Sequence, residues 1–231
     1  MLTGPQFYSA NVANVRARIA AAARQAGRTA ADVRLLAVCK QHDAAAIRAV
    51  AGTGQVEFAE NYTQEALPKI LALEDLALTW HFIGQLQANK TRAIAEQFAW
   101  VHTVDRERTA RRLSEQRPHY AQPLQVLLQV RLDAALHKGG VTVDELPALA
   151  AAVAVLPRLQ LRGLMCLPEP SADPEAQRVP FRRLRELAAG LNARGFGLDT
   201  LSMGMSDDLE AAVAEGATIV RIGTAIFGRR G

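Results

Sequence analysis

Short apolar runs alternate with longer amphipathic segments along the whole chain. The runs, rich in β-branched residues, cover 34–40, 56–61, 78–84, 100–105, 125–132, 160–167, 199–204 and 218–227. Segments with helical spacing lie between them, at 43–52, 62–76, 86–98, 106–116, 143–156, 175–194 and 207–215. This alternation predicts parallel strands joined by helical crossovers, in a sheet that is covered on both faces.

Eight such units in 231 residues predict a single (β/α)8 TIM barrel over about residues 34–228. A further helix is predicted at about 6–26, with Val12, Val15 and Ile19 on one stripe. The chain ends soon after the eighth run, so we expect this N-terminal helix to cover the flank that the usual final helix would fill. An open doubly wound sheet would need a glycine-rich turn after its first strand, and residues 37–42 contain no glycine. We therefore expect one domain, residues 1–231.

Composition and charge exclude several classes of protein. The net charge is +4 and the pI about 9.4, but the arginines are spread along the chain without a block of like charge, which argues against nucleic-acid binding. The two cysteines lie far apart and the N-terminus lacks an apolar signal core, which favours a reducing cytoplasm. No apolar run approaches the roughly 20 residues of a membrane span, so we expect none.

Lysine is rare in this chain, and one lysine has an unusual position. Only four of the 27 basic residues are lysine, and Lys40 ends the apolar run 35–39. Arginine stays protonated in proteins, so lysine alone among the two can act as an amine nucleophile. Lys40 is therefore a candidate for covalent chemistry. The alternative is a lysine whose stem covers apolar surface at a strand end.

Polar residues gather where the predicted strands end, and in a TIM barrel these ends form the active-site rim. The set is Lys40, Asn61, His81, Gly84, Asp105, Arg131, Ser206, Arg221, Gly223 and Thr224. Barrels often bind phosphate after strands seven and eight, where Ser206 and Gly223-Thr224 lie. Ser206 as a helix N-cap and Gly223 as a turn glycine remain the alternatives. A lysine amine with a phosphate site indicates a Schiff base to a phosphorylated aldehyde, of which pyridoxal 5'-phosphate (PLP) is the prominent cofactor.

Six stretches carry longer motifs: 35–40, 58–62, 80–90, 162–165, 201–208 and 220–228. They closely resemble those of the pyridoxal phosphate homeostasis protein family, and the resemblance runs from about residue 10 to the C-terminus. It implies a single barrel similar to the N-terminal domain of bacterial alanine racemases. It also implies a protein that holds PLP as a Schiff base and buffers the cofactor or delivers it to PLP-dependent apo-enzymes.

The resemblance assigns roles to matching positions. Lys40 would form the Schiff base, Asn61 would lie beside the cofactor ring, and the phosphate would be bound by Ser206, Gly223 and Thr224. Arg221 would face the pyridine nitrogen, where a fixed cation disfavours ring protonation and weakens the cofactor as an electron sink. An ion pair between Arg221 and Asp105 is the alternative.

The remaining lysines and the departures from the family pattern lead to further expectations. Lys90 and Lys138 match positions that the family tends to keep as lysine, and we expect Lys138 to lie near the mouth and assist cofactor uptake or release. Lys69 follows Pro68 on a predicted helix and is expected at the surface. Cys166 and the pair Gln41-His42 differ from common family residues. Cys39 alternates with Lys40 along its strand and should face the helices.

The sequence favours a carrier over an enzyme. Alanine racemases take their second acid-base group from a separate β-domain of the partner subunit, and this chain has no room for that domain. Its tyrosines, Tyr8, Tyr62 and Tyr120, offer no obvious replacement, and an open mouth would admit water. We expect a monomeric PLP-binding protein without robust catalysis. A weak amino-acid racemase or decarboxylase, and a lysine-dependent aldolase acting on a sugar phosphate, are the enzymatic alternatives.

Overall fold

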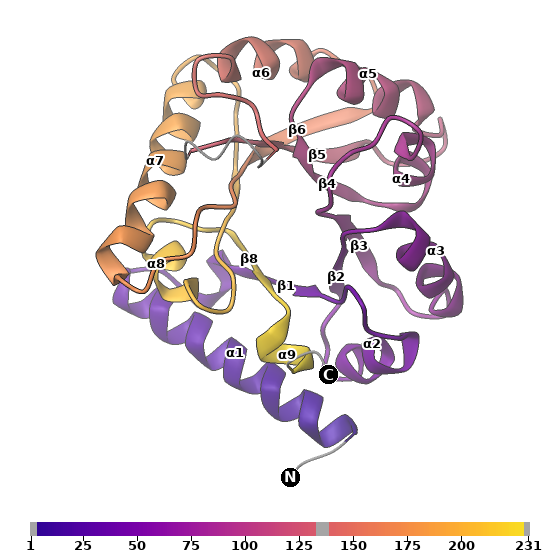
Figure 1. The fold of residues 1–231 in the computed structure, drawn as a ribbon, viewed down its shortest axis with the longest axis vertical. Helices are drawn as coiled ribbons and strands as arrows, with labels where there is room; N and C mark the ends of the chain where they lie inside the picture. Colours follow the sequence, from indigo (N-terminus) through magenta and orange to yellow (C-terminus); the bar gives the residue numbers. More distant parts are fainter. Residues whose placement is uncertain (1–3, 133–138, 229–231) are drawn as a thin grey trace.

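Eight parallel strands form a closed barrel in chain order (Figure 1). The computed structural model describes residues 4–132 and 139–228. The strands are β1 (Arg34–Val38), β2 (Glu57–Glu60), β3 (Thr79–Phe82), β4 (Trp100–Val104), β5 (Leu124–Gln129), β6 (Leu159–Met165), β7 (Thr200–Ser202) and β8 (Ile219–Ile222). The barrel closes where β8 pairs with β1, with Leu36 opposite Arg221. The predicted TIM barrel is confirmed.

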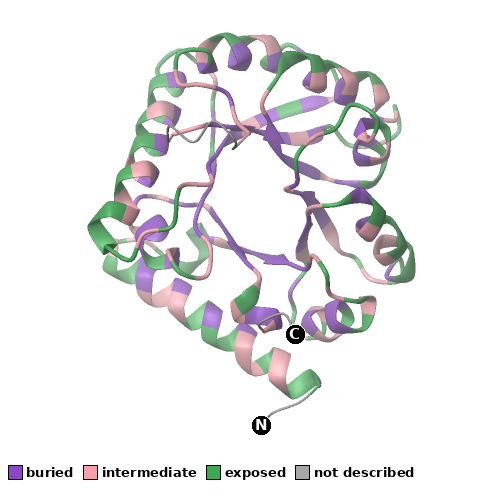
Figure 2. Ribbon diagram, in the orientation of Figure 1, coloured by how far each residue is buried: buried purple, intermediate pink, exposed green. Residues whose placement is uncertain are grey.

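Helices surround the barrel as an outer ring (Figure 1). They are α2 (Ala44–Ala51), α3 (Thr63–Ala72), α4 (Thr91–Gln97), α5 (Glu107–Gln116), α6 (Leu146–Ala154), α7 (Pro174–Asn192) and α8 (Leu209–Ala214). Their buried stripes face the strands (Figure 2), and the main core lies between the two layers. Smaller apolar clusters lie apart from this layer, one of Leu36, Val38, Ala59 and Ile219 and another of Trp100, Leu127 and Met165. Burial of both faces explains why the strands read as near-continuous apolar runs.

The N-terminal helix α1 (Pro5–Gln25) covers the flank of the barrel beside α8 and α2 (Figure 1). Its buried stripe contains Val12, Val15 and Ile19, as the spacing predicts. Asn11 Nδ2 of the helix donates a hydrogen bond to the carbonyl of Ile226 at 2.8 Å. Just after the helix, Arg28 Nη2 donates to the carbonyl of Ala217 at 2.8 Å. The expected position of this helix is confirmed.

The last predicted strand, 218–227, is too long. β8 ends at Ile222, and residues Thr224–Phe227 form a short helix, α9. The carbonyl of Gly223 accepts hydrogen bonds from the amides of Ile226 and Phe227, both at 2.9 Å, which turns the chain out of the strand. Phe227 is buried against His42, with ring centroids 4.6 Å apart. These apolar residues are thus buried by a helical turn, which a short apolar run does not distinguish from a strand.

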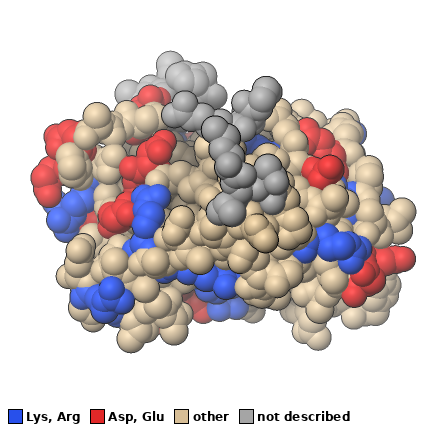
Figure 3. Space-filling model, turned by 90° about the horizontal axis from the view of Figure 1, so that it is seen from below, with Lys and Arg blue, Asp and Glu red and all other residues tan. Residues whose placement is uncertain are grey.

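Charged side chains of both signs are interspersed on the face shown in Figure 3. In the described part of the chain, no helix has the length and apolar character needed to cross a membrane.

Candidate functional site

A cavity of about 270 Å³ lies where the strands end at the barrel rim. Its lining includes every described residue that the sequence assigns to cofactor binding: Lys40, Asn61, Ser206, Arg221, Gly223 and Thr224. These residues come from four strand ends, β1, β2, β7 and β8, so the fold brings together positions that are far apart in the sequence. Lys138, the lysine predicted near the mouth, lies outside the described residues.

Lys40 lies in a tight turn between β1 and α2. The next residue, Gln41, has a φ of 65°, a left-handed conformation that is uncommon for residues other than glycine. Its amide donates a hydrogen bond to Glu65 Oε2 at 2.9 Å, and Asp43 caps α2 by accepting from the amide of Ala46 at 2.8 Å. Both contacts hold the turn, because the first fixes the backbone amide next to Lys40 and the second fixes the side chain of Asp43, three residues after Lys40. A strained residue held by its surroundings is typical of a functional site.

An ion pair between Lys69 and Glu60 lies behind this turn. Lys69 Nζ is 2.6 Å from Glu60 Oε1 and donates a second hydrogen bond, at 3.2 Å, to the carbonyl of Cys39. The Lys69 side chain is only 11% exposed and that of Glu60 is fully buried. The expectation of a surface lysine is therefore wrong. The α3 helix covers the end of β2, so the long lysine stem reaches inward to a buried carboxylate.

Burial controls the ionisation of the groups in this second layer. It raises the pKa of the Glu60 carboxyl, while the hydrogen bond and the positive charge of Lys69 act in the opposite direction. Burial also raises the pKa of the Cys39 thiol well above its usual value, and the charge of Glu60 adds to this effect. Cys39 packs in the main core between the barrel and the helices, as its alternation with Lys40 predicts. Cys39 is thus a core residue with an unreactive thiol.

The guanidinium of Arg221 is fixed from two sides. Its Nη1 donates to Ser202 Oγ and its Nη2 donates to the carbonyl of Cys166, both at 2.9 Å. Complete burial lowers the pKa of Arg221, yet arginine remains a cation and a donor in proteins. The alternative ion pair with Asp105 is not formed within the described residues, since Asp105 lies 3.6 Å from Arg106 instead.

Ser206 belongs to the loop before α8, and α1 holds this loop in place. The N-cap of α8 is Asp208, whose Oδ1 accepts a hydrogen bond from the amide of Met205, so the interpretation of Ser206 as the N-cap is wrong. Arg18 of α1 donates to the carbonyl of Ser206 at 3.0 Å and forms a bidentate ion pair with Glu210. The N-terminal helix therefore fixes one wall of the cavity as well as covering the barrel.

Tight backbone packing surrounds Asn61 and Gly223. The Oδ1 atom of Asn61 is buried and has no hydrogen-bond partner among the described residues. The main chain of Asn61 packs directly on Gly84, where an added Cβ would lie 1.8 Å from the Asn61 carbonyl oxygen. A Cβ on Gly223 would lie 3.3 Å from the carbonyl oxygen of Val38. Asn61 thus has a buried amide oxygen without a donor among the described residues, and its main chain packs against position 84, where only glycine fits.

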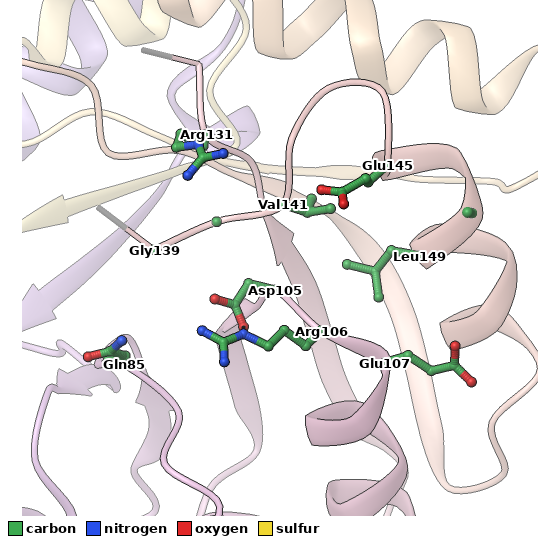
Figure 4. Close-up of a pocket in the computed structure, with 11 residues that line it drawn as sticks. Gln85, Asp105, Arg106, Glu107, Arg131, Gly139, Val141, Glu145 and Leu149 are labelled. Atoms are coloured by element: carbon green, nitrogen blue, oxygen red, sulfur yellow. Dashed lines mark ion pairs between the residues drawn. The ribbon is translucent and has the colours of Figure 1, made fainter. Parts of the chain in front are cut away.

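Two of the predicted rim residues, Asp105 and Arg131, line a different cavity. This larger hollow, about 640 Å³, lies over the ends of β4 and β5 and contains Gln85, Arg106 and Glu145 (Figure 4). A third cavity, of about 420 Å³, shares Asn61 with the Lys40 cavity and Asp105 with the larger one. The rim is therefore divided along its circumference, and the structure does not bring Asp105 and Arg131 to Lys40.

His81 lies inside the barrel below the rim, so its predicted rim position is wrong. It is fully buried, and its Nδ1 is 2.9 Å from His102 Nε2. His102 in turn contacts Ser202, whose hydroxyl accepts the hydrogen bond from Arg221. Sequence reasoning missed His102 and Ser202. The available signal was a histidine inside the predicted strand 100–105 and a serine inside the predicted strand 199–204, positions that a sheet covered on both faces buries.

Known proteins with the same fold and matching sequence define the class. The family described as alanine racemase, N-terminal domain, matches residues 11–231. A pyridoxal phosphate homeostasis protein from Pseudomonas aeruginosa is 59% identical over 220 residues, which cover 95% of this chain and 94% of that protein. The Escherichia coli protein of the same name is 50% identical over 223 residues, covering 95% of each chain.

Solved structures agree with these sequence matches. The structure of PipY from Synechococcus elongatus with PLP bound has a TM-score of 0.84 and 37% identity, covering 96% of this chain and all of PipY. Alanine racemase from Corynebacterium glutamicum shares the fold, with a TM-score of 0.67 at 20% identity over 98% of this chain and 62% of the racemase. The barrel is thus of the alanine racemase N-terminal type. Within that class, the chain belongs to the pyridoxal phosphate homeostasis protein family.

Proposed function

We propose that this protein binds PLP covalently through Lys40 and acts in PLP homeostasis, by buffering the cofactor or delivering it to apo-enzymes. The observation that carries the proposal is that a lysine amine, a buried guanidinium and the Ser206 and Gly223-Thr224 loops line one cavity of about 270 Å³. A volume near the lower end of small-molecule sites suits a single compact cofactor. The names of the two relatives and the PLP-bound PipY structure support the same function.

The residues of the cavity fit this cofactor. PLP supplies an aldehyde that condenses with an amine, an electron-withdrawing ring and a phosphate group. The Lys40 amine forms the covalent bond, and Asn61 is part of the same lining. Ser206, Gly223 and Thr224 bind the phosphate: Ser206 and Thr224 provide hydroxyl donors, and Gly223 leaves room for close approach of the backbone.

Arg221 favours a protein that binds PLP over one that uses PLP for efficient catalysis. Arginine donates hydrogen bonds and does not release its proton, so a ring nitrogen beside it stays unprotonated. An unprotonated ring accepts electrons from a substrate poorly. None of the three tyrosines lines the Lys40 cavity: Tyr62 and Tyr120 are exposed, and Tyr8 packs against Phe227. The chain therefore favours binding and release over racemisation or decarboxylation.

Delivery to PLP-dependent apo-enzymes, a monomeric state and a cytoplasmic location are parts of the same proposal. Both cysteines are buried and neither forms a disulfide, which suits a reducing compartment. We further propose that Lys138 assists transfer of the cofactor. Lys138→Ala should slow the transfer of PLP to an apo-enzyme or lower the affinity for PLP, and unchanged rates and affinity would rule out this role.

A spectroscopic experiment tests the function. Purified protein loaded with PLP should show a visible absorption band that borohydride abolishes. The band should be absent in Lys40→Ala and retained in Lys90→Ala, a matched variant of a lysine outside this cavity. A sugar-phosphate aldolase would show no such band. Robust turnover of any amino acid by the wild-type protein would contradict the carrier function.

A further inference from the structure

A chain of polar side chains runs through the barrel interior from Arg221 to Glu57. Arg221 Nη1 donates to Ser202 Oγ at 2.9 Å, and Ser202 Oγ is 2.9 Å from His102 Nδ1. His102 Nε2 is 2.9 Å from His81 Nδ1, and His81 Nε2 lies 3.7 Å from Glu57 Oε1. The members come from five strands, β8, β7, β4, β3 and β2. They connect the cofactor end of the barrel with its opposite end.

The chemistry of the two end groups sets the direction in which hydrogen bonds are donated along these side chains, from Arg221 towards Glu57. Arginine is a donor only, so Ser202 accepts from Arg221 and has one proton left to donate to His102 Nδ1. A neutral histidine carries one N–H, so His102 donates from Nε2 to His81 Nδ1. His81 then carries its proton on Nε2, which forms no hydrogen bond with the described residues and lies 3.7 Å from Glu57 Oε1, an electrostatic contact. The reverse order would place the lone pair of His81 Nε2 against that carboxylate.

The surroundings support neutral histidines between two fixed charges. Burial lowers the pKa of His81 and lowers that of His102 well below its usual value. Glu57 forms an ion pair with Arg34, whose Nη1 is 2.9 Å from Glu57 Oε1. The Arg34 guanidinium also lies over the Trp100 ring, 4.8 Å from its centroid. The far end of the chain is therefore anchored by an ion pair.

We propose that Ser202 and His102 are positioning residues for Arg221, which they hold in the orientation that presents its remaining N–H groups to the cavity. His81 and Glu57 complete the device, because they fix which nitrogen of His102 accepts the hydrogen bond from Ser202. Of these five side chains, only Arg221 lines the cofactor cavity, so the effect of the series on PLP rests on the proposed function. The arrangement of protons along the series does not depend on that function.

The proton arrangement can be tested without cofactor. In protein labelled with 15N-histidine, NMR of the imidazole nitrogens should show His102 and His81 neutral at pH 7, each protonated on Nε2. Ser202→Ala should shift the His102 Nδ1 signal. Ser114→Ala should leave this signal unchanged. Ser114 is a buried serine whose hydroxyl donates a hydrogen bond to the carbonyl of Pro157, and it is not one of the five side chains from Arg221 to Glu57. Protonation of His102 on Nδ1, or on both nitrogens, would overturn the proposal.

The effect on the cofactor site is tested in PLP-loaded protein. Ser202→Ala should weaken PLP binding about tenfold, the scale of one lost hydrogen bond to a charged group, and should shift the visible band. Borohydride should still trap PLP on Lys40, Ser202→Thr should restore both properties, and Ser114→Ala should match the wild type. Equal spectra and affinities for Ser202→Ala and Ser114→Ala would overturn the positioning role. Failure of the wild type to trap PLP would instead contradict the proposed function, and the NMR result would still decide the proton arrangement.

Discussion

Replacing Lys69 with methionine leaves the carboxyl group of Glu60 buried without its cationic partner. Lys69 Nζ lies 2.6 Å from Glu60 Oε1, and the Glu60 side chain is fully buried. Methionine keeps most of the lysine stem, so the change removes the charge and two hydrogen bonds with little loss of packing. One of these hydrogen bonds holds the carbonyl of Cys39, next to Lys40. The variant thus tests both stability and the support of the covalent site.

The expected loss of stability follows from the ionisation of Glu60. In the wild type, burial raises the pKa of Glu60 and Lys69 opposes the rise. Without Lys69, the folded protein must keep Glu60 protonated, which costs about 1.4 kcal/mol for each pH unit above its unfolded pKa of about 4.3. The free energy of unfolding should therefore fall by about 4 kcal/mol at pH 7.5 and by about 2 kcal/mol at pH 5.5.

The sign of this pH dependence is specific to a raised carboxyl pKa. Stability is fully present below the unfolded pKa of Glu60 and is lost as the pH rises toward the folded value. Urea unfolding followed by tryptophan fluorescence at pH 5.5 and 7.5 measures the effect. Lys69→Met with Glu60→Gln should lose the added pH dependence, and Lys90→Met, at the half-exposed start of α4, should stay close to wild type. An equal loss at both pH values would refute the reasoning.

Two further substitutions test the walls of the cavity. Gly84→Ala places a Cβ 1.8 Å from the carbonyl oxygen of Asn61, so we expect a loss of about 3 kcal/mol or more in urea unfolding, and a stability within about 0.5 kcal/mol of wild type would contradict this packing. Arg18→Ala frees the Ser206 loop, so PLP titration should show weaker binding, with a stability loss below about 1 kcal/mol because the ion pair is exposed. Arg48→Ala, which removes a comparable exposed ion pair far from the cavity, should cost similar stability and leave PLP affinity unchanged, so equal affinities for the two variants would refute the role of Arg18.

The fold and one side of the site could be predicted because, in a TIM barrel, the C-terminal ends of the strands lie together at the rim that carries the active site. Lys40, Ser206 and Arg221 are distant in the sequence, yet each lies at or near the C-terminal end of a strand, and all three line one cavity. This relation predicts the face of the barrel on which a residue lies, but not where around the rim, or how deep in the barrel, its side chain lies. Asp105 therefore belongs to another cavity, and His81 lies below the rim because its strand continues beyond it.

The interactions behind the rim could not be predicted, because they depend on the reach of single side chains. The apolar pattern places Lys69 on a helix, but only the packing of α3 against β2 brings its amine to Glu60. His102 and Ser202 are buried polar residues of β4 and β7, and the sequence does not show which group each of them contacts. Their contact spans 100 residues of sequence and is set by the closure of the barrel.

The central claim is that Lys40 is the residue that holds PLP, and peptide mapping after borohydride reduction tests it most directly. PLP-loaded protein is reduced, digested and analysed by mass spectrometry to locate the modified lysine. We predict that the modification is confined to the peptide containing Lys40 and disappears when Lys40 is replaced by alanine. Modification at Lys69, Lys90 or Lys138 with Lys40 unmodified, or no modification of the wild-type protein, would contradict the account.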